Sequence, residues 1–398
     1  MKTKIALALV LLMALAACSP DPTVTPTETQ PLPTAAGTIA TATQPAAIAA
    51  AEPTAVAEIP TETLPAEPTA VPELISIAAK ELAVPWEVIF LPEGDMLVTE
   101  RPGTLVRIGT DGHRLPIEGV HHVGEGGLMG LVLHPNFAEN HWLYLYLTSS
   151  QGGQVINRVE RYVYQDGQLS DRAVILDNIP GSPVHDGGRM EFGPDELLYI
   201  TTGDASVTAN AQNLDSLSGK ILRLNDDGSL PVDNPFGTAV YSYGHRNPQG
   251  LAWDEEGRLW STEHGPSGLG SGFDELNLIE PGQNYGWPTI QGDKEAEGMV
   301  KPVLHSGANE TWAPGDVEII EGMVYFTGLR GRTLYAVPLD DIRPESLQRH
   351  FAGEYGRLRA LRVGPGGLLY MSSSNMDGRG NPIAGDDHIY RVDPAQLP

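Results

Sequence analysis

Six short apolar runs recur along the chain, and residues typical of turns (Gly, Pro, Asn and Asp) separate them. The runs start at Met96, Leu143, Leu198, Leu259, Val324 and Leu369. Successive starts are 47, 55, 61, 65 and 45 residues apart, which is close to the length of a four-stranded propeller blade with its loops. Because no long stretch here has a helical period, the pattern predicts an all-β fold, a six-bladed β-propeller.

The sequence around each run is typical of a β-meander. Five of the six runs follow another strand-like segment and a tight turn, as in Glu87–Phe90 followed by Pro92–Gly94. Several precede a third such segment, as in Ile221–Leu224. Since a propeller blade consists of adjacent antiparallel strands joined by short turns, we expect residues 74–398 to form the propeller domain.

A hairpin fixes where the ends of its two strands lie. The start of the first strand and the end of the second lie at the same end of the sheet, so these positions from all blades are expected to meet at one end of the axis. Before the first strands stand Glu125–Gly127, His185–Arg189, His245–Gln249 and Arg357–Arg359, and after the second strands stand Gly203–Asp204, His264–Pro266 and Leu329–Arg330. The pattern predicts one site built from segments far apart in the sequence.

The overall charge makes the composition of this predicted site unusual. The chain has 25 Lys plus Arg against 51 Asp plus Glu, a formal net charge of −26, which argues against binding to nucleic acid or to an anionic membrane surface. Nevertheless Arg246, Arg330, Arg357 and Arg359 are all expected beside His185. These cationic side chains predict an anionic ligand on the axis.

The first 17 residues are typical of a secretory signal. Lys2 and Lys4 precede the apolar run Ile5–Ala17, which is too short to span a bilayer comfortably. The segment Leu15–Cys18 resembles a bacterial lipobox, which implies cleavage before Cys18 and lipid attachment to its sulfur. This interpretation places the protein in the bacterial cell envelope, held to the membrane by the lipid alone and facing the extracytoplasmic side, in the periplasm or at the outer cell surface. Ordinary signal cleavage that leaves a thiol is the alternative.

Residues 18–73 are dominated by Thr, Pro, Ala and Glu. They hold 11 of the 33 prolines, and no Lys or Arg occurs between Lys4 and Lys80. Because such a segment has too few large apolar side chains to offset its chain entropy, we expect a disordered tether with polyproline II character.

Specific sequence motifs then indicate a protein family. They are His185-Asp186-Gly187-Gly188-Arg189, Phe192-Gly193-Pro194-Asp195, Thr202-Gly203-Asp204, Gly219-Lys220-Ile221-Leu222-Arg223, Gly244-His245-Arg246-Asn247-Pro248-Gln249-Gly250, Glu263-His264-Gly265-Pro266, Asp274-Glu275-Leu276-Asn277 and Asn284-Tyr285-Gly286-Trp287-Pro288. In this order, from about Leu82 to Val392, the sequence resembles the glucose/sorbosone dehydrogenase family, soluble aldose sugar dehydrogenases that use pyrroloquinoline quinone (PQQ). The resemblance implies a six-bladed propeller with the quinone on the axis at one end.

The resemblance also implies a reaction and its residues. In the family, a hydride passes from the anomeric carbon of an aldose to a quinone carbonyl carbon while a histidine removes the hydroxyl proton. His185 resembles that base, which suits proton abstraction near pH 7 as a neutral imidazole, and Asp204 resembles the carboxylate that orients it. Arg246 and Asn247 match an Arg-Asn pair that faces the reactive carbonyls, so Arg246 is expected both in catalysis and in cofactor binding.

The implied cofactors are PQQ and Ca2+. PQQ carries three carboxylates, which guanidinium groups bind well, and Arg357 and Arg359 match the family's Arg-x-Arg quinone-binding pair. Alternation along a strand places these two side chains on one face. Gly265 and Pro266 match residues whose backbone carbonyls bind the Ca2+ that polarises the quinone.

The family has a second calcium site, away from the quinone. It uses the stretch from Asp274 to Tyr285, so Glu275 and Tyr285 are the expected ligands. A metal ion there would be structural, because it would cross-link a loop that otherwise lacks a core.

Three positions depart from the family pattern. Glu125 stands where a glutamine contacts the quinone, and a carboxylate there is compatible with binding when it is protonated or turned toward the metal or the sugar. Arg330 stands where a lysine is usual, which preserves the charge but changes its geometry. Asp186 replaces the usual Asn beside the base, where its charge would act on the pKa of His185.

Two functions of a different class remain open from the sequence. One is a Ca2+-dependent lactonase or esterase propeller, and the other is a non-catalytic propeller that binds sugars or proteins. For the dehydrogenase, the expected partners are an aldose substrate and an external electron acceptor. Trp86, Trp260 and Trp287 are expected in the core between blades, and Lys220 is expected to support a loop rather than to form a Schiff base.

Overall fold

The computed structural model describes residues 74–268 and 271–398. All of them lie within one compact unit, Ala70–Pro398. The expected signal peptide, residues 1–17, and the expected tether, residues 18–73, lie outside the described residues. Within the described part of the chain, no helix has the length and apolar character needed to cross a membrane.

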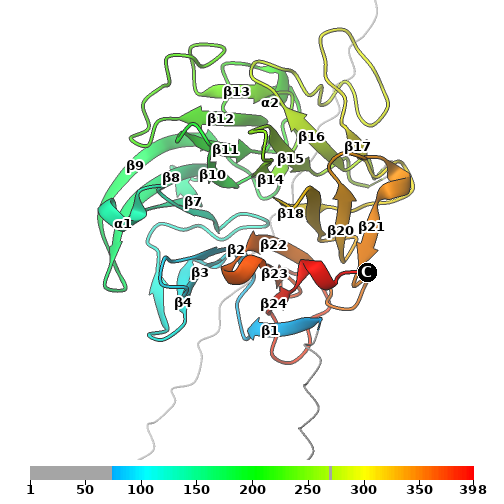
Figure 1. Cartoon of the computed structure of the whole chain (residues 1–398). Coiled ribbons are helices and arrows are strands. Elements are labelled where there is room, and N and C mark those ends of the chain that lie inside the picture. The colour runs from blue at the N-terminus through cyan, green and yellow to red at the C-terminus, as the bar shows by residue number, and fades with distance from the viewer. Residues whose placement is uncertain (1–73, 269–270) are drawn as a thin grey trace, which may run out of the picture. The chain divides into compact units, whose positions relative to one another are not determined.

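The described chain is a six-bladed β-propeller, as the repeat predicts (Figure 1). Each blade is a four-stranded antiparallel sheet, and the first strand of each blade contacts the first strands of its two neighbours around a common axis. From the innermost strand outward, the blades are β2 (Pro85–Phe90), β3 (Met96–Glu100), β4 (Thr104–Ile108) and β5 (His113–Pro116); β6 (Leu128–Leu133), β7 (Trp142–Gln151), β8 (Gln154–Gln165) and β9 (Gln168–Pro180); β10 (Met190–Phe192), β11 (Leu198–Thr202), β12 (Lys220–Leu224) and β13 (Val240–Tyr243); β14 (Pro248–Trp253), β15 (Leu259–Glu263), β16 (Glu275–Ile279) and β17 (Leu304–His305); β18 (Pro314–Ile320), β19 (Met323–Gly328), β20 (Thr333–Pro338) and β21 (Gln348–His350); and β22 (Leu358–Val363), β23 (Leu369–Ser373), β24 (Ile389–Val392) and β1 (Ile75–Ala79). The connections contain the short α-helices α1 (Phe137–Asn140) and α2 (Ala209–Gln212) and the 3-10 turns η1 (Pro344–Ser346), η2 (Pro365–Gly367) and η3 (Pro394–Gln396).

The second strand of each blade carries the clearest sequence signal because neighbouring strands and blades cover it on all sides. Strands β3, β11, β15 and β23 are buried at every residue, and each begins at the first residue of its predicted run. Strands β7 and β19 each begin one residue before the predicted run. The first strand of the fifth blade, β18, was not predicted, because Asp316 and Glu318 interrupt its apolar pattern.

The ring is closed by strands from both ends of the described chain. β1 pairs with β24 in antiparallel register, with Ile75 opposite Val392 and Ile77 opposite Tyr390. The sixth blade therefore takes its outermost strand from the N-terminal end and its other three strands from the C-terminal end (Figure 1).

Ion pairs fill the middle of the axis. Arg189, which directly precedes β10, is fully buried and pairs with Glu87 and, at 3.1 Å, with Asp316. Its Nε donates to the carbonyl oxygen of Gln249 at 2.9 Å, and its guanidinium lies 4.4 Å from the centre of the Trp86 ring. The cation is thus surrounded by acceptors.

A second arginine extends this network. Arg362 pairs with Glu191 and lies 3.6 Å from Glu87 and 3.5 Å from Glu318. Burial raises the pKa of Glu191, and it raises that of Glu318 to about 7. We call this group the axial cluster; it consists of Arg189, Arg362, Glu87, Glu191, Asp316 and Glu318.

Candidate active site

A cavity of about 520 Å³ opens where the blade loops meet the axis. Its wall comes from segments that precede the first strands of the blades and from segments that follow the second strands. The predicted site residues on this wall are Glu125, His185, Arg246, Gly265, Pro266, Arg330, Arg357 and Arg359. Those not on it are Asp204, Asn247, Glu275 and Tyr285. We call this space the axial cavity.

His185 and Asp204 form a hydrogen-bonded pair at the wall of the axial cavity. Nδ1 of His185 lies 2.8 Å from Oδ1 of the fully buried Asp204, and that oxygen also accepts from the N–H of Ser206 at 2.8 Å. The other carboxylate oxygen accepts from Nε1 of Trp287 at 2.9 Å. Among the described residues, Nε2 of His185 has no hydrogen-bond partner, so this nitrogen is available to accept a proton.

The backbone around His185 is shaped for close packing. His185 itself has a φ of 65°, and Gly187 follows with 63°. A Cβ atom at Gly187 would lie 2.6 Å from the carbonyl oxygen of Thr201, so only glycine allows the loop to lie this close to β11. The loop therefore presents the imidazole from a position fixed by contact with the blade.

Glu125 is held as a carboxylate by an arginine that the sequence analysis missed. Arg379 pairs with one oxygen of Glu125, and the other oxygen accepts from the N–H of His185 at 3.1 Å. Burial alone would raise the pKa of Glu125, but Arg379 and the other positive or donating groups lower it to about 2. Of the two states considered for Glu125, this environment favours the charged carboxylate, because a neighbouring guanidinium balances its charge.

Asp186 serves the loop rather than the imidazole. Its Oδ1 accepts from Nδ2 of Asn157 at 2.9 Å and from the N–H of Ser182 at 3.0 Å. Burial raises the pKa of Asp186 to about 6. The side chain thus ties the loop that carries His185 to the second blade.

Arg246 enters the axial cavity between two loops. Its guanidinium donates to the carbonyl oxygen of His264 and to Oγ of Ser267, both at 3.2 Å, and it lies 5.4 Å from the centre of the Trp287 ring. Burial lowers the pKa of Arg246. No carboxylate of the described residues forms an ion pair with it, so the charge remains open to a ligand.

Asn247 lies behind the wall of the cavity. Its side-chain oxygen accepts from the N–H of Gly187 at 3.0 Å, and its own N–H lies 3.3 Å from Oε1 of Glu263. The side chain is fully buried, and its Nδ2 has no partner among the described residues. Asn247 therefore supports the loop of His185 and holds one unused donor.

Arg357 and Arg359 alternate at the start of the sixth blade but have different surroundings. Arg357 pairs with Asp377 at 2.8 Å. Arg359 donates to Oε1 of Gln249 at 3.1 Å and has no carboxylate partner among the described residues. Burial, together with repulsion from Arg101 and Arg357, lowers the pKa of Arg359 to about 9. An anion beside Arg359 would stabilise its charged form and raise this pKa again.

Arg330 follows β19 and has an exposed side chain on the cavity wall. Its backbone N–H donates to the carbonyl oxygen of Trp312 at 3.1 Å, which fixes the loop. The guanidinium forms no ion pair within residues 74–268 and 271–398. Together with Arg246 and Arg359, it is therefore the third arginine on the wall without a carboxylate partner among the described residues.

Gly265 and Pro266 lie on the wall in a loop that is held from both sides. The N–H of Gly265 donates to Oδ1 of Asp274 at 2.8 Å, and Nε2 of His264 donates to the carbonyl oxygen of Pro314 at 2.9 Å. Burial lowers the pKa of His264 to about 3, so this ring is neutral. Within the described part of the chain, the carbonyl oxygens of Gly265 and Pro266 accept no hydrogen bond, and such oxygens are ligands that Ca2+ prefers.

Glu275 and Tyr285 are placed apart from the axial cavity. Burial and the charge of Glu263 raise the pKa of Glu275 to about 8, and Oδ1 of the neighbouring Asn277 has no partner among the described residues. The Tyr285 hydroxyl donates to the carbonyl oxygen of Leu278 at 2.6 Å, so it is already used. Within the described residues, no group of three or more His, Cys, Asp or Glu side chains is arranged to hold a metal ion.

Two residues of this region, Arg379 and Arg101, were not predicted from the sequence, and a third, Trp287, lies elsewhere than expected. Trp86 and Trp260 are core residues as predicted, whereas Trp287 is half-buried and contacts Asp204, which corrects its assignment to the core. Arg379 lies on the cavity wall. Arg101 is buried, and its charge contributes to the lowered pKa of Arg359. Arg379 follows Asp377 in a glycine-rich loop, and no motif marks it.

Lys220 supports a loop, as the sequence analysis predicted. Its ammonium donates to the carbonyl oxygens of Asn210 and Ser218, each at 2.7 Å, and of Ala211 at 3.2 Å. Burial lowers the pKa of Lys220 to about 7. The side chain is used within the third blade and does not line the axial cavity.

Comparison with known proteins agrees with this architecture. The family model of glucose/sorbosone dehydrogenases matches residues 82–385. An aldose sugar dehydrogenase from Streptomyces coelicolor, solved in its PQQ-bound form, is 38% identical with a TM-score of 0.72, over 80% of this chain and 97% of that one. Aldose sugar dehydrogenase YliI of Escherichia coli (strain K12) is 30% identical over 76% of this chain and 91% of its own length.

A further relative is quinoprotein glucose dehydrogenase B of Acinetobacter calcoaceticus. It is 32% identical over 59% of this chain and 56% of its own length. The family model covers most of the propeller, and the similarity to YliI extends over nearly the whole of that protein. The chain therefore belongs to the glucose/sorbosone dehydrogenase family of oxidoreductases.

Proposed function

We propose that the protein oxidises aldose sugars at the anomeric carbon to the lactone, with PQQ and Ca2+ as cofactors. The observation that carries this proposal is the His185–Asp204 pair on the wall of a cavity that also holds unpaired arginines. The PQQ-bound form of the Streptomyces coelicolor relative supports it.

In this proposal His185 is the general base. Asp204 accepts from Nδ1–H, which leaves the lone pair on Nε2 and toward the cavity. A sugar hydroxyl that binds against Nε2 gives its proton to the imidazole as the adjacent C–H bond breaks. The buried Asp204, held by Trp287 and Ser206, stabilises the imidazolium that forms. The proton can then return to solvent, because the His185 side chain is 17% exposed.

The residues on the wall fit the proposed quinone. Arg246, Arg330 and Arg359 have no carboxylate partner among the described residues, and guanidinium groups bind carboxylates with two parallel hydrogen bonds. Behind the wall, Asn247 holds a buried Nδ2 donor without a partner among the described residues. When bound, PQQ supplies the electrophilic carbonyl carbon that takes the hydride from the sugar.

The two proposed calcium sites differ in their donors. Near the axial cavity, the free carbonyl oxygens of Gly265 and Pro266 are suited to a hard cation. Away from it, a cation beside Glu275 would offset the burial and the Glu263 charge that raise the pKa of that carboxyl to about 8. Tyr285 would contribute through its backbone, because its hydroxyl is bonded to Leu278.

The test is reconstitution of the purified full chain with PQQ and CaCl2, followed by dye reduction over a panel of aldoses. We expect dye reduction only when PQQ is present, with the lactone as first product. Lactone hydrolysis sustained by Ca2+ without PQQ would instead favour the lactonase. Sugar binding without dye reduction would favour the non-catalytic propeller.

We further propose that Cys18 anchors the protein to the membrane through a lipid and that an external acceptor takes the electrons. The lipobox-like segment Leu15–Cys18 supports the first point. Expression of wild type and Cys18→Ser, followed by membrane fractionation, tests it. We expect wild type in the membrane fraction and the variant in the soluble fraction; a soluble wild type would contradict the anchor.

A further inference from the structure

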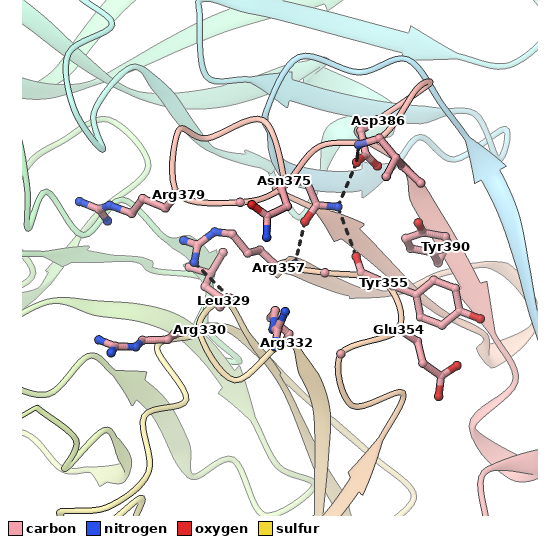
Figure 2. Close-up of a pocket in the computed structure, with 15 residues that line it drawn as sticks. Leu329, Arg330, Arg332, Glu354, Tyr355, Arg357, Asn375, Arg379, Asp386 and Tyr390 are labelled. Carbon is pink, nitrogen blue, oxygen red and sulfur yellow. Dashed lines mark hydrogen bonds between the residues drawn. The ribbon is translucent and has the colours of Figure 1, made fainter.

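A second cavity, of about 430 Å³, lies beside the axial cavity. We call it the annex. It lies between the loop that follows β19 and the loops at the ends of β22 and β23, and it shares Leu329, Arg330, Arg357 and Arg379 with the axial cavity (Figure 2). Its volume is within the range of small-molecule sites, about 300 to 1,000 Å³. A ligand that projects from the axial cavity past Arg330 would therefore enter a formed space.

The lining of the annex is suited to a sugar ring. The half-buried Tyr355 packs against the buried Tyr390, with ring centres 4.6 Å apart (Figure 2). Both line the annex, together with the exposed side chains of Asn381 and Glu354. An aromatic surface packs on the C–H face of a pyranose, while amide and carboxylate groups bind its hydroxyls.

The charges of the annex are not balanced. Arg357 pairs with Asp377, and Arg379 pairs with Glu125. In contrast, the exposed side chain of Arg332 forms no ion pair among the described residues, and neither does Arg330. Figure 2 shows Arg332 between Arg330 and Glu354 in the view.

Besides these two unpaired guanidiniums, the annex lining holds a single exposed acid, Glu354. Asp386, the other acid on the wall, is buried and bonded to His388. The annex thus carries an excess of positive charge in a chain whose formal net charge is −26. A neutral ligand would leave both guanidiniums without an anionic partner.

We propose that the annex binds a sugar residue that carries a carboxylate and is linked to the aldose whose anomeric carbon is oxidised. The proposal rests on the proposed function, and it names the substrate class as acidic oligosaccharides. Arg332 lines the annex but not the axial cavity, and it provides the planar pair of donors that matches a carboxylate. Arg330, on the wall of both cavities, orients the same residue.

The test compares two disaccharides with the same reducing-end glucose, one with a glucuronosyl and one with a glucosyl second residue. Their methyl glycosides cannot be oxidised at the anomeric carbon, so calorimetric binding to the full chain is measured without turnover. We expect the acidic glycoside to bind about tenfold more tightly, which one charge-assisted hydrogen-bond pair can provide. Arg332→Gln is expected to abolish this preference, and Arg343→Gln, an exposed arginine of the same blade, is expected to retain it.

Equal binding of the two glycosides to wild type, or an unchanged preference in Arg332→Gln, overturns the proposal. Kinetics with the free disaccharides separate it from the proposed function. There we expect a lower KM for the acidic sugar at unchanged kcat. If neither sugar is oxidised but the preference in binding persists, the dehydrogenase proposal fails and the annex site stands. If free glucuronate competes as well as the disaccharide does, the annex binds anions in general and the oligosaccharide proposal fails.

Discussion

The axial cluster and the axial cavity use the same cationic side chain in opposite ways. In the cluster, Arg189 and Arg362 meet four carboxylates, and the network is complete without a ligand. At the cavity, Arg246 and Arg359 are buried without a carboxylate partner among the described residues, and the pKa of Arg359 falls to about 9 through burial and like charges. The difference teaches that missing partners, rather than the number of arginines, mark the place of an anionic ligand.

Removing Arg189 gives the largest expected loss of stability. Arg189→Met leaves Glu87 and Asp316 buried without their cation, and breaking a buried pair in this way costs about 3 to 5 kcal/mol. Arg359→Met is the matched change at the cavity, and its cost is expected to stay below about 1 kcal/mol because no buried carboxylate loses a partner. Urea unfolding of both variants measures the difference. Equal losses of unfolding free energy in the two variants would contradict the distinction between the paired arginines of the axial cluster and the unpaired arginines of the axial cavity.

The next effect concerns chemistry at the cavity. His185→Ala removes the proposed base, and kcat is expected to fall about 10³-fold. Binding of the quinone, followed by its absorption spectrum, is expected to stay unchanged, because the arginines remain in place. His121→Ala is the control, since that histidine is exposed and outside the cavity. Full activity in His185→Ala would exclude the proposed mechanism.

The unpaired Arg359 of the axial cavity is tested through its effect on the affinity for PQQ. Arg359→Met is expected to weaken PQQ binding about 10- to 100-fold, the loss of one hydrogen-bonded charge pair. Arg343→Met, at an exposed site whose arginine pairs with Asp341, is the control and is expected to bind PQQ normally. Fluorescence titration of apoprotein measures both. Unchanged affinity in Arg359→Met would show that the ligand does not use this charge.

The smallest expected effect is a pH dependence of stability caused by Glu275, which lies apart from the axial cavity. The pKa of Glu275 is about 8 in the fold, against an ordinary value of 4.5, because of burial and the charge of Glu263. Between these pH values the folded chain binds more protons than the unfolded chain, so Glu275 lowers stability as pH rises. In metal-free protein we expect Tm to fall from pH 5.5 to pH 8, and Ca2+ to raise Tm more at pH 8.

Glu275→Gln tests the assignment of this pH dependence. The variant is expected to keep more of its stability at pH 8, by about 1 kcal/mol or more, and to lose the response to Ca2+. Glu255→Gln, an exposed acid in the turn between β14 and β15 of the same blade, is expected to behave as wild type. A wild-type pH profile in Glu275→Gln would assign the effect to other buried acids.

How much of the fold can be predicted depends on what surrounds each strand. The strands from Met96, Leu198, Leu259 and Leu369 are covered on all sides, so their apolar runs mark their bounds. β18 could not be predicted from its sequence, because an acidic residue usually indicates an exposed position. Asp316 is instead buried and pairs with Arg189 in the axial cluster.

The candidate site divides in a similar way. His185 and Asp204 lie at the ends of one hairpin, so strand geometry and the motif both bring them together. The pair between Glu125 and Arg379 joins positions 254 residues apart in different blades, and no local pattern records such a contact. Trp287 was assigned to the core because aromatic residues are usually buried, yet its N–H is bonded to Asp204.

The pairing of β1 with β24 makes the completeness of the ring depend on five residues near the start of the propeller. A chain trimmed past Ala79 would leave β24 as an open edge with unpaired N–H and C=O groups. Such an edge can recruit the equivalent strand of another molecule, so proteolysis at this one place would convert a self-contained protein into one prone to strand exchange and aggregation.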